Sequence, residues 1–510
     1  MKYSNLIKMF SVIATVLVIG NSCTDDFESL NTDPSLLTKE QLDEALLLTK
    51  VQKEVFISDN KPTGRIASFA GYWASGGGLI FDATDYGGEF NKGYNNLLNI
   101  SEIIRLTNNN PEKINRNAIA RVMRVYIFQY LTDLYGDIPY SEAVQPSEEV
   151  IAQPKYDTQE SIYKDMLNEL KEAAGDLDEN STDNFGSADL IYAGDIINWK
   201  KLANSLRLRL ALRVRYVDPS LASTEISDVL TSDFIQDNSE NAFVTTSDDF
   251  ESNQNSLYNE IVFNNGAING YMGKAIIDIL NEGEDPRRPI MATPTPRSVA
   301  LAESQDDPSL LNYRGRPIGL LGENEFAMYQ DSVLSKVGVK YRQPIVDLYV
   351  MDYSEVCFAL AESKSILGLG QTDADTWYKR GIRANMELHG VDNAEIDEFM
   401  LDPIATLQGN AEEQLEQIIR QKSVALFPNI YEAFAEWRRT GYPKILIGSM
   451  VGDTDGQIPR RLTYPFAEAN FNSSNYEEAS DRIGGDGLLT KVWWDANPNV
   501  PFEHPGSIFD

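Results

Sequence analysis

Apolar side chains recur at intervals of three and four residues along several long segments of this chain. Such spacing places them on one face of an α-helix. Residues 158–177 and 197–217 both show the pattern, with Thr158 or Ser161 as a possible cap of the first helix. We expect Pro219 to end the second. A further stripe, within residues 118–136, consists of Ile119, Val122, Met123, Tyr126, Tyr130 and Leu134.

Four more segments with this pattern lie at residues 352–370, 373–391, 411–427 and 429–441. Two of them end at a glycine, which is common at the C-terminus of a helix. The predicted helices follow one another in pairs, although no consensus repeat of about 34 residues can be aligned. Helical hairpins stacked in the tetratricopeptide manner fit this arrangement.

The periodicity fades between about residues 218 and 345, where Gly, Pro, Asn and Ser are frequent. A long stretch of this kind inside a helical protein is normally a functional loop system or an inserted subdomain. The sequence leaves both interpretations open. The C-terminal part, from about residue 441, is also rich in loop-forming residues.

The formal net charge of −33 makes nucleic acid an unsuitable partner, because binding a polyphosphate requires clustered Lys and Arg. With 42% hydrophobic and 10% aromatic residues, the chain has the composition of a globular protein. In so acidic a chain, arginines in an apolar segment are expected to pair with carboxylates and to form no basic binding patch. The arginines concerned are Arg207, Arg209, Arg213 and Arg215.

Residues 1–22 have the parts of an export signal. Lys2 and Lys8 precede an apolar run of twelve residues that ends at Gly20. A membrane-spanning helix needs about 20 such residues, so a secretory signal is the better interpretation. A signal that ends on a cysteine, here Cys23, resembles that of a bacterial lipoprotein, in which the thiol is acylated. Gly20 stands where the usual signal has Leu, and an ordinary cleaved signal before a chance cysteine is the alternative.

Residues 23–38 are then expected to form a polar tether between the lipid and the folded part. The acidic "TDDFES" after Cys23 resembles the tag that sends lipoproteins to the cell surface in Bacteroidetes-type bacteria. The other cysteine of the chain is Cys357, so we expect no internal disulfide.

The sequence shows no motif of a known catalytic centre. His389 and His504 lie far apart, neither is in HExxH spacing, and no G-x-S-x-G elbow occurs. "GDTDGQ", at residues 452–457, lacks the full set of calcium ligands of an EF-hand loop. We therefore predict a protein that is not an enzyme and has no cofactor or metal centre. Paired carboxylates of a glycoside hydrolase stay an alternative, because their diagnostic separation is not a property of sequence.

An aromatic and glycine-rich segment at residues 69–94 is the best candidate for binding. Its glycines argue against a helix and for loops with special backbone angles. Aromatic rings on loops, next to short polar side chains, suit a sugar or a peptide. The alternative is that the rings pack the loop onto the core. The candidate ligand-binding residues are Tyr72, Trp73, Phe81, Tyr86 and Phe90, together with Tyr258, Tyr271 and Tyr313 from the irregular region.

Several blocks of the sequence, in this order, resemble the SusD/RagB family of outer-membrane nutrient-binding lipoproteins from Bacteroidetes. They are "LTDLYGDIPYSEA", "PKYDTQESIYKDMLNELKEA", "WKKLANSLRLRLALR", "MDYSEVCFALAESK", "QKSVALFPNIYEAFAEWRRTGYP", "IPRRLTYPFAEANFN" and "VWWD". The resemblance implies a mainly α fold with little β structure, in which tetratricopeptide-like helix pairs form a scaffold for a loop-rich, ligand-facing region. We expect a single domain over residues 39–510, with the scaffold at about 39–217 and 346–440.

The resemblance also implies a function. Family members capture a nutrient, mostly a glycan and sometimes a peptide, for a SusC-like TonB-dependent outer-membrane barrel. The protein would be held in the outer membrane by its N-terminal lipid and would face the cell exterior. The aromatic segment near Trp73 falls roughly where relatives place residues that stack on sugars. The leading hypothesis is therefore a surface glycan-binding protein, with a helical glycoside hydrolase or a peptide binder as the alternatives.

Overall fold

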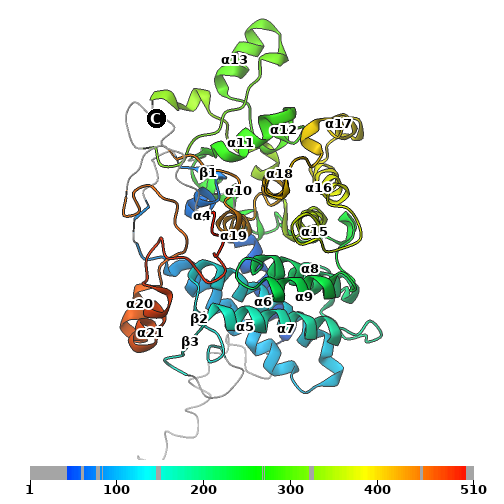
Figure 1. Ribbon diagram of the computed structural model, residues 1–510, viewed down its shortest axis with the longest axis vertical. Helices are drawn as coiled ribbons and strands as arrows, with labels where there is room; N and C mark the ends of the chain where they lie inside the picture. The colour runs from blue at the N-terminus through cyan, green and yellow to red at the C-terminus, as the bar shows by residue number, and fades with distance from the viewer. Residues whose placement is uncertain are drawn as a thin grey trace, which may run out of the picture. The chain divides into compact units, whose positions relative to one another are not determined.

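Long helices form most of the structure (Figure 1). The computed structural model describes residues 43–58, 63–75, 81–82, 84–144, 151–266, 268, 270–320, 327–447 and 452–500. Cys23, the signal segment 1–22 and the tether 23–38 lie outside these ranges. The N-terminal helices are α3 (Glu44–Gln52), the π-helix η2 (Lys53–Ser58), α4 (Gly64–Phe69), α5 (Gly87–Thr107), α6 (Ile114–Tyr135), α7 (Gln159–Asp176), α8 (Ile196–Arg213) and α9 (Pro219–Val229).

The second group of long helices follows a short-helix region. It comprises α15 (Tyr353–Leu367), α16 (Ala374–His389), α17 (Asn393–Phe399), α18 (Ala411–Ala425) and α19 (Ile430–Thr440). Consecutive helices from α5 to α9 pack on one another, and α15 packs on both α16 and α18. The tetratricopeptide-like helix pairs are thus present, and the mainly α fold is confirmed. From Leu47 onward the chain forms one compact unit.

Helix boundaries agree well with the apolar pattern, with one correction. Thr158 caps α7, because its side chain accepts a hydrogen bond from the backbone N–H of Ser161. Pro219 was expected to end the helix that carries the arginines, but α8 already ends at Arg213. Pro219 is instead the first residue of α9, with Asp218 as its cap. Proline is favoured there because the first turn of a helix has no partner for its N–H.

The glycine-rich segment 69–94 contains more helix than its composition indicated, so the prediction of loops was wrong for residues 87–94. Helix α5 starts at Gly87, whose N–H is bound by Asp85 Oδ1 at 3.0 Å. Within α5, a Cβ added to Gly93 would lie 2.7 Å from Leu131 Cδ1 of α6. Glycine costs about 1 kcal/mol of helix propensity relative to alanine. The close approach of the two helices explains why that cost is tolerated.

Helix α8 carries Arg207, Arg209 and Arg213 into the interior, and Arg215 follows just after its end. All four meet carboxylates, as the sequence predicted. Arg209 binds Glu355 of α15 through Nε and Nη2, both at 2.7 Å. Arg215 Nε donates to Glu362, also on α15, at 2.6 Å. These contacts join α8 to α15 across the two groups of helices. The remaining pairs are Arg207 with Glu225 and Asp228, and Arg213 with Asp133 and Glu432.

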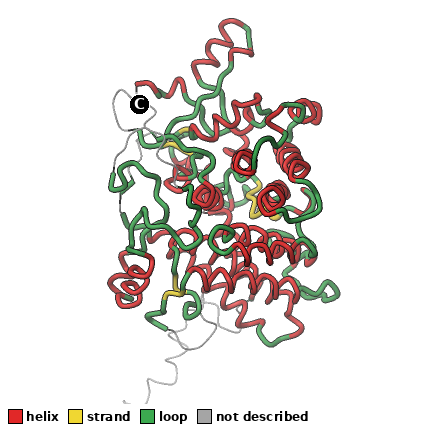
Figure 2. Tube along the Cα trace, in the orientation of Figure 1, coloured by secondary structure: helices red, strands yellow, loops and turns green. Residues whose placement is uncertain are grey.

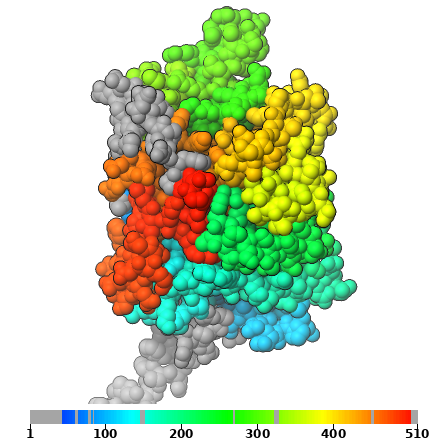
Figure 3. Space-filling view, viewed as in Figure 1, coloured from blue at the N-terminus to red at the C-terminus, as the bar shows by residue number. Residues whose placement is uncertain are grey.

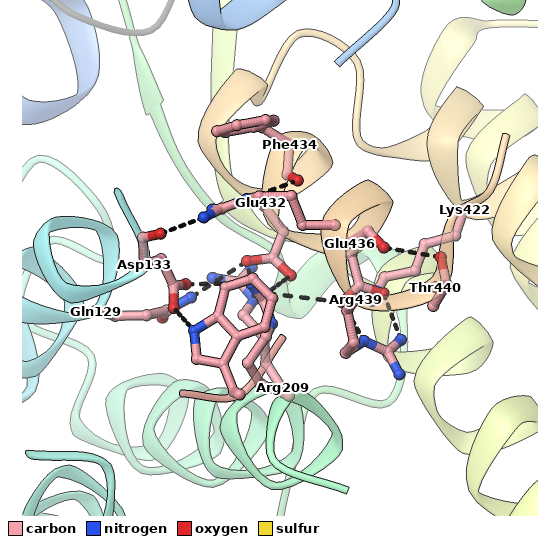
Figure 4. Close-up of polar contacts among 12 residues, drawn as sticks. Gln129, Asp133, Arg209, Lys422, Glu432, Phe434, Glu436, Arg439 and Thr440 are labelled. Carbon is pink, nitrogen blue, oxygen red and sulfur yellow. Dashed lines mark hydrogen bonds and ion pairs between the residues drawn. The ribbon is translucent and has the colours of Figure 1, made fainter. Parts of the chain in front are cut away.

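Helix α19 supplies the carboxylates at the centre of this buried network (Figure 4). Glu436 accepts from Arg439 Nη2 at 2.7 Å and from Lys422 Nζ at 3.0 Å. Burial alone would raise the pKa of Glu432 and Glu436, but the neighbouring cations hold both pKa values below the ordinary 4.5. Arg213 has the largest effect on Glu432, and Arg439 on Glu436. Both carboxylates therefore stay ionised in the core.

Between the two groups the chain forms shorter elements (Figure 2). The sequence pattern fades here because the helices span only a few residues and bury narrow faces. They are α10 (Ser256–Phe263), α11 (Lys274–Asn281), α12 (Arg288–Met291), α13 (Pro296–Gln305) and the 3-10 helix η10 (Val339–Arg342). Two further helices, α20 (Phe466–Phe471) and α21 (Ser473–Ile483), lie in the C-terminal part.

The strands are short and antiparallel, and in the described residues they form three separate pairs. These are β1 (Trp73–Ala74) with β5 (Tyr271–Met272), β2 (Ile138–Pro139) with β3 (Tyr156–Asp157), and β4 (Ala242–Thr245) with β6 (Asp347–Met351). Among the residues described, no helix is both long and apolar enough to cross a membrane.

Candidate ligand-binding site

The β1–β5 pair brings together two segments that the sequence analysis selected separately. Trp73 lies opposite Met272, and Ala74 lies opposite Tyr271. The backbone N–H of Gly273 also donates to the carbonyl of Tyr72 at 2.8 Å. The aromatic segment and the irregular region therefore meet, although about 200 residues separate them. Helices α11 to α13 follow β5 and lie together in the green part of the molecule, away from α5 to α7 (Figures 1 and 3).

Trp73 is buried and lies flat against the chain just before β5. Gly270 has φ +143°, and a Cβ added there would lie 2.5 Å from Trp73 Cε2. A residue with a side chain would displace the indole, so glycine is needed at this position. The tryptophan thus fixes the path of the backbone into β5.

The other four aromatic residues predicted in the first segment are buried as well. The Tyr72 hydroxyl donates to the Ser423 carbonyl at 2.6 Å, and burial raises the pKa of Tyr72 well above its ordinary value. The rings of Phe81 and Phe90 have edge contacts with Phe69 and Tyr135, at centroid distances of 5.7 and 5.2 Å. The Tyr86 hydroxyl donates to the carbonyl of Asp82 at 3.2 Å. These positions favour the alternative that the rings pack the segment onto the core, and ligand contact by them stays a prediction.

Tyr271 is also buried, in a small cluster with Leu320, Tyr329 and Leu334. Its hydroxyl donates to Asp331, and cations lie over both tyrosine rings. Arg316 is 5.3 Å from the Tyr271 centroid, and Arg314 is 4.5 Å from the Tyr329 centroid. Such cation–π contacts add to the apolar packing of this cluster. Tyr271 therefore packs in the interior, and ligand contact by it stays a prediction.

Tyr313 and Tyr258 are the two predicted tyrosines that remain half-buried. The guanidinium of Arg288 lies 4.9 Å from the Tyr313 ring centroid, which covers one face of that ring. Tyr258 lies on α10, one turn before Val262, so the two side chains share a face of the helix. Ligand contact by these two tyrosines stays a prediction.

Helix α10 exposes an apolar surface that the sequence analysis did not select. Leu257 is the one buried side chain within α10, whereas Val262 is exposed and Phe263 is 87% exposed. The missed signal was the cluster "LYNEIVF" inside a region otherwise dominated by polar residues. An apolar run on a helix this short packs few of its side chains against the core, so the others stay exposed. We call Tyr258, Val262 and Phe263 the α10 surface.

The α10 surface combines exposed apolar side chains with neighbouring amides. Its rings offer flat apolar faces, and Asn264 and Asn265 follow it directly. Aromatic faces next to amides bind ring compounds through stacking and hydrogen bonds. Within the described ranges, no group of three or more His, Cys, Asp or Glu side chains is placed to hold a metal ion.

Comparison with known proteins relates this architecture to one family. A SusD-like family model described as "Starch-binding associating with outer membrane" matches residues 36–465. A solved chitin-binding protein is 29% identical, with a TM-score of 0.77, and the match covers 89% of this chain and 99% of that one. A SusD homologue from Bacteroides fragilis is 26% identical, with a TM-score of 0.73 and coverage of 89% and 99%.

A chitin-binding SusD homologue from Flavobacterium johnsoniae shares the fold, with a TM-score of 0.71 at 24% identity. The match covers 91% of this chain and 96% of that protein. The comparison with curated proteins found no match.

Proposed function

Because the chain belongs to the SusD-like family of outer-membrane-associated starch-binding proteins, we propose that it is a cell-surface protein that captures a glycan. Membership of this family is consistent with glycan binding and with a location at the outer membrane. The family described by that model is named for binding starch, and two of the solved relatives are named for binding chitin. Oligomers of glucose and of N-acetylglucosamine are therefore the first ligands to test.

The observation that carries the proposal is the α10 surface. An exposed phenylalanine beside an exposed valine and a half-buried tyrosine is unfavourable in water unless a partner covers it. The surface lies on a short helix that is tied to η10, since the Asn255 side chain, which caps α10, donates to the carbonyls of Tyr341 and Gln343 at 2.8 and 2.9 Å. A rigid platform lowers the entropic cost of binding.

We further propose that the protein is anchored by a lipid on Cys23 and passes its glycan to a SusC-like TonB-dependent barrel. Stable anchoring requires more than one acyl chain, because each buried methylene contributes about 0.8 kcal/mol. Mass spectrometry of the mature N-terminus tests the lipid directly: an acylated Cys23 supports the anchor, and an unmodified thiol contradicts it.

Incubation of the purified protein with insoluble chitin and with granular starch tests the proposed function. We expect retention on at least one polysaccharide and no soluble sugar products. Release of oligosaccharides would favour the glycoside hydrolase alternative. Retention on neither, together with binding to peptides, would favour the peptide alternative.

A further inference from the structure

A second, more enclosed candidate site lies behind α10. A cavity of about 320 Å³ is lined by η10, by β6 with the residues on either side of it, and by the end of α16. Ala425 at the end of α18, with Phe427 and Pro428 after it, completes the lining. Small-molecule pockets span about 300–1,000 Å³, so this cavity has room for a single ring and not for a chain of them. All of its lining residues belong to the described part of the chain.

Aromatic rings form the walls of the cavity. Tyr341 and Phe427 lie at right angles, with an interplanar angle of 86° and centroids 4.8 Å apart. Tyr349, on β6, also lines the cavity and contacts Phe243 at 5.5 Å on its other side. The walls therefore offer flat apolar faces in more than one orientation.

Asn385 of α16 brings a buried donor to the cavity. Its side chain is only 1% exposed, and its Oδ1 accepts from Arg287 Nη1 at 2.8 Å. The Nδ2 group makes no hydrogen bond to any residue that the structure describes. Because Asn385 lines the cavity, this donor is available to a molecule inside it.

Asp352 brings the matching acceptor. It is 6% exposed, and its Oδ1 accepts from the Ser354 hydroxyl at 2.5 Å and from the Glu355 N–H at 2.8 Å. Its Oδ2 has no partner among the described residues. The same cavity is therefore lined by an amide donor and by a carboxylate acceptor, and neither atom makes a hydrogen bond to the described residues.

His389 and Tyr341 add a second acceptor. His389 Nδ1 lies 2.8 Å from the carbonyl of Asn385, which can only accept, so Nδ1 carries the proton. Burial lowers the pKa of His389 to about 3, so the ring is neutral and Nε2 is an acceptor. The Tyr341 hydroxyl, 2.8 Å away, donates to Nε2 and leaves its own oxygen free to accept.

We propose that this cavity binds one neutral sugar ring. Asn385 Nδ2 donates to an oxygen of the ring or its substituents, Asp352 Oδ2 and the Tyr341 oxygen accept from hydroxyls, and the aromatic walls cover the apolar faces. An anionic ligand is disfavoured because the lining contains two carboxylates, Asp347 and Asp352, against one lysine, Lys340. A cation would leave the Asn385 donor without a partner.

Saturation-transfer NMR on the whole mature protein tests the site, with D-glucose, N-acetyl-D-glucosamine and choline as probes in the millimolar range. We expect transfer to at least one of the two sugars and a weaker response for choline. Transfer to neither sugar, or stronger transfer to choline, would overturn the proposal.

Isosteric variants assign the binding to this cavity. Asn385→Asp keeps the acceptor for Arg287 but removes the donor, and Asp352→Asn keeps the cap of α15 but removes the acceptor. We expect each to weaken sugar binding at least tenfold. Asp373→Asn makes the same change at the exposed cap of α16 and should leave binding unchanged.

A third variant tests the site at an exposed position, where a substitution should not disturb folding. Ile345 lines the cavity and is about half exposed, so Ile345→Trp should block the entrance without loss of a buried contact. Unchanged binding in a folded Ile345→Trp protein would refute the site. Phe471→Ala removes an exposed ring of α20 that belongs to neither site and should leave monosaccharide binding intact. Loss of monosaccharide binding in Ile345→Trp with unchanged retention on polysaccharide would separate the cavity from the α10 surface.

Discussion

The scaffold and the region behind α10 differ in how they treat buried polar groups. In the scaffold, α8, α15, α18 and α19 bury arginines, glutamates and Lys422, and these meet in ion pairs of 2.5–3.6 Å. In the cavity, Asn385 and Asp352 each keep one polar atom without a partner in the described chain. The first arrangement fixes a structure, and the second leaves hydrogen-bonding capacity for something else.

The comparison teaches that buried charge alone does not indicate a site. The scaffold contains far more ionisable groups than the cavity, and its carboxylates and cations pair with one another, although Arg207 Nε and Arg213 Nε make no hydrogen bond to the described residues. A buried ion pair adds little net stability relative to apolar residues, but removal of one member is costly. The predictions below test each half of this contrast.

The largest expected effect is on the scaffold. Arg213→Met would leave the buried carboxylates of Asp133 and Glu432 without their principal cation. We expect a loss of about 3–5 kcal/mol in the free energy of unfolding, measured by equilibrium denaturation. Lys164→Met removes an exposed ion pair with Glu160 and should leave the unfolding midpoint unchanged. A loss below about 1 kcal/mol for Arg213→Met would contradict this prediction, because removal of an exposed ion pair costs that little.

The network also predicts how stability depends on pH. The pKa values of Glu362, Glu432 and Glu436 are lowered in the fold, so their contribution is present above the ordinary 4.5 and is lost as the pH falls below it. We expect the melting temperature to drop steeply below pH 4.5.

The contribution of Asp352 to stability depends on pH in the opposite direction. Burial raises its pKa from 3.8 to about 6, so the contribution of Asp352 is present below pH 3.8 and is lost as the pH rises through 6. Asp352→Asn should remove that part of the pH dependence and leave the acid limb unchanged. Melting curves of both proteins between pH 3 and 8 measure the difference, and identical profiles would contradict it.

A smaller effect is expected at the contact between α5 and α6. Gly93→Ala would place a Cβ 2.7 Å from Leu131, and we expect a net loss of about 1–3 kcal/mol. Gly175→Ala in α7 meets nothing within 4 Å and should stabilise by about 0.5–1 kcal/mol through helix propensity. Denaturation of the two variants should therefore give shifts of opposite sign, and shifts of the same sign would refute the close helix approach.

The long helices could be predicted because each buries a continuous stripe. The segments that became α6, α7, α8, α15 and α18 show that stripe clearly, and the partners of the α8 arginines followed from the charge of the chain. Helix α5 was missed in part because its glycines argue locally for a loop, whereas the reason for Gly93 lies in Leu131, on another helix.

The candidate sites were harder to predict. Aromatic density in residues 69–94 does not reveal which way a ring points, and Trp73 points at Gly270. Phe263 could have been predicted to be exposed, because it is an apolar residue that belongs to no apolar helix face. The cavity had no sequence signal, because Tyr341, Asp352, Asn385 and Phe427 come from separate segments that the fold brings together.

The account depends most directly on whether the α10 surface holds the glycan. Phe263→Ala and Phe471→Ala remove phenylalanines that are 87% and 75% exposed, from α10 and α20 respectively. Covering such a ring contributes about 1.5 kcal/mol, or roughly tenfold in affinity. Isothermal titration with the oligosaccharide of whichever polysaccharide retains the protein should show that loss for Phe263→Ala and none for Phe471→Ala. Equal affinity of both variants and the unmodified protein would contradict the claim.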